Sequence, residues 1–178
     1  MFETNENWDI VDYGPCDISK IKDAVLDMIL EEGSFTGPKD IIKIHKIYDF
    51  PEDWNGEDIS GFEVSTNKKL LDSVEQIVSH LETFCEGTRA KVLISRLYSN
   101  EEIAGSYADK KYHLSVRRHH IPIITNDNIY IGIGQTEINM KESILYEINT
   151  SKDFVFKNHS DSDRYHLIVD ILPNSQKN

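Results

Sequence analysis

The chain has 178 residues, of which 39% are hydrophobic and 28% are charged, an ordinary composition for a folded globular protein. Asp and Glu number 31 against 19 Lys and Arg, and the resulting net charge of −12 argues against nucleic acid and anionic membranes as partners. Two distant cysteines, no basic leader before an apolar run and no apolar stretch of transmembrane length predict a cytoplasmic protein without a disulfide framework.

The first half of the chain predicts two helices. After a short apolar segment at 8–11, which suggests an edge strand, apolar residues at helical spacing predict a helix over 19–32. A second helix begins after Asn67, a favourable N-cap residue, and we expect Gly87 to stop it. Its apolar stripe consists of Leu70, Leu71, Val74, Ile77, Val78, Leu81 and Phe84. This helix is expected to pack on a sheet.

Between these helices, residues 41–48 alternate in polarity and predict a strand. The following segment, 49–66, contains Pro51, Gly56, Gly61 and many acidic residues, which is typical of a loop. We interpret it as a candidate lid over a site.

From residue 89 onward the sequence is rich in short strands. Predicted strands cover 90–98, 115–124, 128–134, 136–140, 143–148, 153–157 and 164–171. Helices followed by a run of short strands predict an α+β, predominantly β chain. Its core would be a double-stranded β-helix, a jelly roll of the cupin kind, buttressed by the two helices. We expect one domain over 1–178, with its core at about 10–173 and a short polar C-terminal tail.

Two strand segments each carry an arginine and a histidine on one face. Arg118 and His120 share a face, and so do Arg164 and His166, because strand residues two apart point the same way. Two such strands facing one interior would suit a carboxylate ligand, which a guanidinium binds bidentately. Exposed basic residues or structural ion pairs would explain the pattern equally well.

The motifs around these residues resemble those of the aspartyl/asparaginyl (and prolyl) β-hydroxylase family, which are 2-oxoglutarate- and Fe(II)-dependent dioxygenases. Residues 118–122 match Arg-x-His-x-Pro, and residues 158–170 match Asn-x-Ser-x-x-x-Arg-x-His-Leu-x-x-Asp. Residues 138–142, which lead into a strand, also fit, and the resemblance covers roughly 10–173.

The resemblance implies a set of cosubstrate contacts. Arg164 would hold the far carboxylate of 2-oxoglutarate, and Arg118 with His120 would form a second binding pair. Ser95 would supply a further hydroxyl contact.

This sequence departs from the family at the metal. Where the resemblance implies two iron-binding histidines, the chain has Tyr107 and Phe154. Asp109 is the remaining candidate metal ligand, with His113 in the adjacent loop able to assist it. A conventional Fe(II) site is therefore not expected, since iron of this class needs imidazole ligands and open positions. The turn at 158–163 is interpreted as a hairpin turn rather than a calcium loop.

Three functions are consistent with these observations. The first is an oxygenase with an unusual metal site. The second is a catalytically inactive binding module that holds a small dicarboxylate or an acidic side chain of a protein partner. In the third, a structural or assembly module, the polar groups only pair with one another.

Overall fold

The structure, a computed structural model, describes residues 8–30, 41–45, 67–106 and 111–176. The whole of the predicted lid at 49–66, together with Tyr107 and Asp109, therefore lies outside the described residues.

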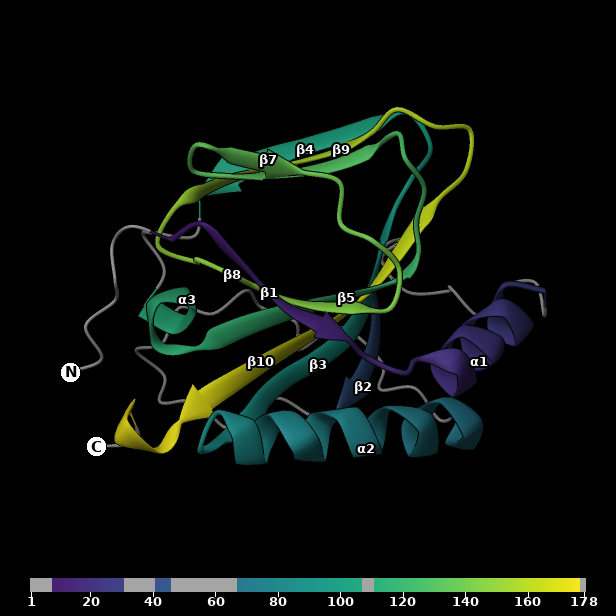
Figure 1. The fold of residues 1–178 in the computed structure, drawn as a ribbon. Helices are drawn as coiled ribbons and strands as arrows, with labels where there is room; N and C mark the ends of the chain where they lie inside the picture. The colour runs from purple at the N-terminus through teal and green to yellow at the C-terminus, as the bar shows by residue number, and fades with distance from the viewer. Residues whose placement is uncertain (1–7, 31–40, 46–66, 107–110, 177–178) are drawn as a thin grey trace.

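Two antiparallel sheets face each other (Figure 1). The six-stranded sheet has the order β1-β8-β5-β10-β3-β2, and the four-stranded sheet has the order β4-β9-β6-β7. The strands of the larger sheet are β1 (Ile10–Pro15), β2 (Ile41–His45), β3 (Gly87–Leu97), β5 (Arg117–Ile124), β8 (Ile144–Ile148) and β10 (Arg164–Pro173). Those of the smaller sheet are β4 (Glu101–Ser106), β6 (Ile129–Ile133), β7 (Thr136–Ile138) and β9 (Asp153–Asn158). The predicted jelly roll is confirmed, with β1 as an edge strand.

Helices α1 (Ser19–Leu30) and α2 (Lys68–Phe84) cover the outer face of the six-stranded sheet, away from the smaller sheet (Figure 1). Asn67 caps α2 as predicted, because its Oδ1 accepts a hydrogen bond from Leu70 N at 3.0 Å. Two short helices, α3 (Lys111–Ser115) and the 3-10 turn η1 (Asn174–Gln176), complete the described elements. Among the described residues, no helix is long and apolar enough to span a membrane.

Strand alternation gives the six-stranded sheet two different faces. Odd-numbered residues of β10, such as Leu167, Val169 and Ile171, are fully buried against α1 and α2. The opposite, inner face looks toward the four-stranded sheet, where Ile131, Ile133, Met140, Tyr146 and Ile148 form a second apolar cluster. The polar residues of β5 and β10 lie on this inner face. A functional site is therefore expected between the two sheets.

Gly87 does not stop α2, contrary to the prediction. The helix ends at Phe84, and the residue with left-handed backbone is Glu86, with φ of 47°. Gly87 begins β3 instead, where a Cβ would lie 2.6 Å from the Leu172 carbonyl oxygen. Close approach of two backbones therefore explains the glycine.

Three elements were not predicted: strand β4, helix α3 and the 3-10 turn η1. Strand β4 is exposed over most of its length and carries two glutamates, so its sequence shows no apolar alternation. It is defined by its pairing with β9 in the smaller sheet. Helix α3 has only five residues, too few for a helical period to be recognised, and it places His113 in a helix rather than in the predicted loop.

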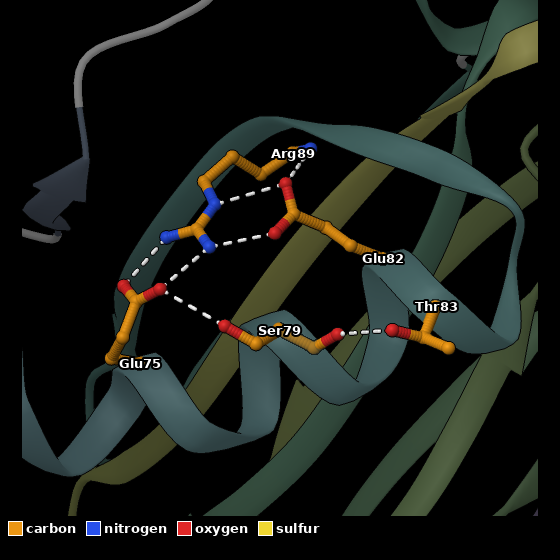
Figure 2. Close-up of polar contacts among 5 residues, drawn as sticks. All are labelled: Glu75, Ser79, Glu82, Thr83 and Arg89. Carbon is orange, nitrogen blue, oxygen red and sulfur yellow. Dashed lines mark hydrogen bonds and ion pairs between the residues drawn. The ribbon is translucent and has the colours of Figure 1, made fainter.

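An ion-pair cluster ties α2 to the start of β3 (Figure 2). Arg89 donates to both oxygens of Glu75 at 2.6 and 2.7 Å, and its Nε and Nη2 donate to Glu82 at 3.1 and 2.7 Å. The two glutamates are seven residues apart, so they share one face of the helix. The hydrogen bonds from Arg89 lower the pKa of Glu82. The cluster thereby fixes how the helix lies on the sheet.

Replacing this arginine tests the cluster. Arg89→Met should lower the free energy of unfolding by about 1–3 kcal/mol, because two carboxylates lose charged hydrogen bonds in a partly buried position. Urea unfolding measures the change. Lys69→Met removes an exposed ion pair to Asp27 and should unfold at nearly the same urea concentration as the wild type. Equal losses in both variants would contradict the assignment.

Candidate functional site

The structure brings the predicted arginines and histidines onto the inner face of two adjacent strands. Arg118 and His120 lie on β5, and Arg164 and His166 lie on β10. All four are buried, with exposed fractions between 0% and 4%. The two strands therefore present them to one interior, as their alternation predicted, and the exposed-surface interpretation is wrong.

Arg164 lies beside the Ser95 side chain of β3. Its Nη2 is 3.5 Å from Ser95 Oγ, and its Cζ is 5.6 Å from the centre of the Phe156 ring on β9. A guanidinium with a neighbouring hydroxyl and an aromatic wall can bind and orient a carboxylate. The role of Arg164 and Ser95 as ligand contacts stays a prediction.

Arg118 forms a buried ion pair. Its Nε and Nη2 donate to the two oxygens of Asp170 at 2.8 and 2.7 Å, and Tyr112 donates to the same carboxylate at 2.7 Å. Asp170 lies directly between Arg118 and Lys91 in the sheet register. Despite its complete burial, the positive charge of Arg118 holds the pKa of Asp170 well below its usual range.

This ion pair was not foreseen, although Asp170 belongs to the motif at 158–170. Its even number places it on the face of Arg164 and His166, and that alternation could have marked it as an inner-face residue. Its partner on β5 follows only from the strand register, which local sequence does not specify. Because Asp170 neutralises Arg118, the structural ion-pair interpretation holds for that arginine.

His120 and His166 lie side by side between the two arginines. Their Nδ1 atoms are 3.4 Å apart, and their rings are nearly perpendicular at 82°. Burial is the main reason that the pKa of each lies well below its usual value, and the charge of Arg164 lowers both further. Both rings are therefore neutral near pH 7.

Phe154 occupies the β9 position at which the sequence resemblance implies an iron-binding histidine. It packs into the inner apolar cluster, with its ring 4.9 Å from that of Phe156. A phenyl ring has no lone pair for a metal. Across the described ranges, no group of three His, Cys, Asp or Glu side chains is placed to hold a metal ion. The residues that the structure describes thus do not fit the usual Fe(II) site.

The remaining metal candidates are only partly described. Asp109 and Tyr107 lie outside the described residues. His113 is fully buried in α3, where its ring lies edge-on to Tyr112, and its carbonyl accepts a hydrogen bond from Thr150. Its assistance to Asp109 therefore stays a prediction.

The turn at 158–163 is not a hairpin turn, because β9 and β10 belong to different sheets. Asn158 donates to the carbonyls of Leu97 and Ser162 at 3.3 and 2.8 Å, and it accepts from the Ser160 hydroxyl at 2.6 Å. Asp163 pairs with Arg96. This network fixes the segment that crosses from one sheet to the other immediately before Arg164. Asn158 and Ser160 therefore help to position Arg164 at the start of β10.

A surface hollow of about 260 Å³ lies elsewhere, between α1 and α2 on the outer face. Its lining includes Cys16, Lys20, Ile77, His80 and Leu145. None of the predicted site residues contacts it. We place the candidate site between the sheets, because the buried charged side chains gather there.

Comparison with known proteins supports the sequence resemblance. The profile described as Aspartyl/Asparaginyl beta-hydroxylase matches residues 44–173. No curated protein matches at a significant level.

Several solved structures share the fold. A prolyl-4-hydroxylase from Pseudomonas putida has a TM-score of 0.60 at 7% identity, covering 95% of each chain. The non-heme monooxygenase ThoJ, as a nickel complex, has a TM-score of 0.57 at 8% identity over 92% of this chain and 73% of its own. An oxidoreductase of the 2OG-Fe(II) oxygenase family from Burkholderia pseudomallei has a TM-score of 0.50 at 8% identity, covering 62% and 60%. At these identities the likeness extends to the fold alone.

The buried ion pair predicts a strong coupling between two substitutions. Asp170→Leu should lower the free energy of unfolding by about 3–5 kcal/mol, because it leaves Arg118 charged and buried. Adding Arg118→Met should recover much of this loss, as chemical denaturation of the two variants will show. Additive losses would contradict the pairing. Glu142→Gln, at a half-exposed pair with Lys22, is the control and should change stability little.

The neutral histidines predict a loss of stability in mild acid. A histidine whose pKa is lower in the folded state is protonated first in the unfolded chain, so falling pH below about 6.5 favours unfolding. Each such ring contributes up to about 1.4 kcal/mol per pH unit. Between pH 6 and pH 5, His166→Asn should lose stability less steeply than the wild type in urea unfolding. Equal slopes for this variant and the wild type would contradict the assignment.

Proposed function

The chain belongs to the Aspartyl/Asparaginyl beta-hydroxylase family, and we propose that within this family it binds a small carboxylate without requiring Fe(II). One observation carries the proposal. On the inner face, the buried guanidinium of Arg164 on β10 lies 3.5 Å from the Ser95 hydroxyl on β3. A buried guanidinium beside a hydroxyl favours a carboxylate ligand between the sheets.

We place the ligand's carboxylate at Arg164 and Ser95. Asp170 already neutralises Arg118, whereas Arg164 has a hydroxyl and an aromatic ring beside it. A ligand at this buried position exchanges water for fixed donors, which strengthens a charged hydrogen bond. The burial of Arg164, at 2% exposed, favours a small free anion over an acidic side chain of a partner protein.

The proposal does not depend on a metal. The family is of the 2-oxoglutarate- and Fe(II)-dependent oxygenase type, in which the bound iron and keto acid supply the oxidising chemistry. Phe154 gives no donor at the expected ligand position. We therefore propose that the fold of this chain serves binding.

Calorimetry under anaerobic conditions tests this function. Acetate, pyruvate, lactate and 2-oxoglutarate are each titrated into the protein with and without Fe(II). At least one should bind saturably without iron, and Arg164→Gln should weaken that binding by at least about tenfold, because the charged contact is lost. Arg117→Gln removes the same charge on the outer face, where Arg117 pairs with Glu147, and should leave binding unchanged.

Two outcomes would overturn the proposal. If binding of 2-oxoglutarate requires one equivalent of Fe(II) and produces a visible charge-transfer band, the chain has the metal site of an oxygenase. If no carboxylate binds the folded wild-type protein, the buried cations are structural. Circular dichroism on each variant shows whether a loss of binding comes from unfolding.

A further inference from the structure

Aromatic side chains of the smaller sheet face the candidate carboxylate site. The centre of the Phe156 ring on β9 lies 5.6 Å from Arg164 Cζ and 6.0 Å from the centre of the His120 ring, both on the larger sheet. Phe154 lies two residues away on the same face of β9, and its ring stacks on that of Phe156 with the centres 4.9 Å apart. Hydrocarbon therefore begins directly beside the charged group and continues along β9.

Strand β4 extends this hydrocarbon to the edge of the smaller sheet. Ile103 is paired with Phe156 and Gly105 with Phe154 in the strand register, so they share the inner face. A Cβ on Gly105 would lie 2.9 Å from Phe154 Cζ, so the phenyl ring lies across the glycine. Ile103 is 41% exposed, and both phenylalanines are half-buried. These three side chains, Ile103, Phe154 and Phe156, form an apolar wall with accessible surface.

The larger sheet also presents hydrocarbon near the arginine. Ile168 lies on the inner face of β10, because the residues on either side of it pack under the helices, and it is half-buried. Going away from the turn at 158–163, β10 presents Arg164 first and Ile168 four residues later. In the same direction β9 presents Phe156 and then Phe154. The space beyond the arginine is therefore apolar on both sides.

Further charges lie beyond this apolar region. Arg118 donates two hydrogen bonds to Asp170, and Lys91 lies directly opposite the same carboxylate in the strand register. Two positive charges and one negative charge leave that end of the inner face with one positive charge in excess. A dicarboxylate is therefore the competing ligand for the site. The surface between the charged ends favours a different class, because only a ligand with a bulky apolar body covers it.

We propose that the ligand of this site is a monocarboxylic acid with an apolar body about the size of a phenyl ring. The inference rests on the proposed function, because Arg164 and Ser95 bind its carboxylate. The body then lies between the apolar wall and Ile168. Ligand sites are mostly apolar, with a few polar groups that fix the orientation, and this arrangement has both parts.

A series of acids with the same carboxylate and a growing apolar body tests the ligand class. Calorimetry without metal compares acetate, benzoate and 3-phenylpropionate, with succinate and 2-oxoglutarate as the dicarboxylates. 3-Phenylpropionate should bind at least about tenfold more tightly than acetate, because its phenyl ring leaves water for the apolar wall. It should also bind more tightly than either dicarboxylate.

Substitutions in the wall locate the apolar body. Ile103→Ser should weaken 3-phenylpropionate by at least about threefold and leave acetate unchanged, because it removes hydrocarbon but no charge. Phe154→Gln should weaken 3-phenylpropionate in the same selective way. Leu26→Ser is the matched control, since Leu26 is 40% exposed on α1 under the other face of the sheet, and it should bind every acid as the wild type does. Arg164→Gln should weaken all of them.

Three results would overturn the inference and leave the carboxylate site intact. They are equal binding of acetate and 3-phenylpropionate, tighter binding of succinate or 2-oxoglutarate, and equal losses in Ile103→Ser and Leu26→Ser. Absence of binding by every acid would instead refute the proposed function. Circular dichroism shows that each variant is folded, and the exposed position of Ile103 keeps the test valid if Phe154→Gln does not fold.

Discussion

Strands β5 and β10, at the centre of the six-stranded sheet, must satisfy an apolar face and a charged face at the same time. On one side, Leu167, Val169 and Ile171 pack under the two long helices. On the other side, the alternate residues bring arginines and histidines between the sheets. Because side chains alternate with a period of two, a register shift of one residue would place charges under the helices and leave the inner face apolar. Stability and the site therefore depend on the same register.

On the inner face, a buried carboxylate lies between buried positive charges, and this arrangement stabilises it. Asp170 lies between Arg118 and Lys91, and the ion pair keeps the carboxylate ionised although it has no access to solvent. Burying two charges costs desolvation energy that the pair only offsets when its hydrogen bonds are complete. Tyr112 from α3 completes them, so a short helix outside the sheets supports the interior.

This chain keeps the family pattern at the turn before β10 and departs from it at position 154. The turn from Asn158 to Asp163 and the arginine that follows it keep the family pattern, and the structure shows that the turn carries the chain from one sheet to the other. On β9, the strand before this turn, Phe154 has a phenyl ring at the position where the resemblance implies a histidine. The hydrogen bonds of the turn and the apolar packing around Phe154 are separate sets of contacts. A fold can therefore keep such a turn between its sheets while the side chain at another position changes.

The sequence by itself determined the features that have a local period: the two long helices, most strands, the cap at Asn67, and the shared face of each arginine and histidine. Strand β4, helix α3 and the role of Gly87 depend on contacts with distant segments and leave no local pattern. The partner of Arg118 and the contact between His120 and His166 were likewise decided only by the tertiary structure. Alternation says which face a side chain occupies, but only the register of two strands says which side chain lies opposite it.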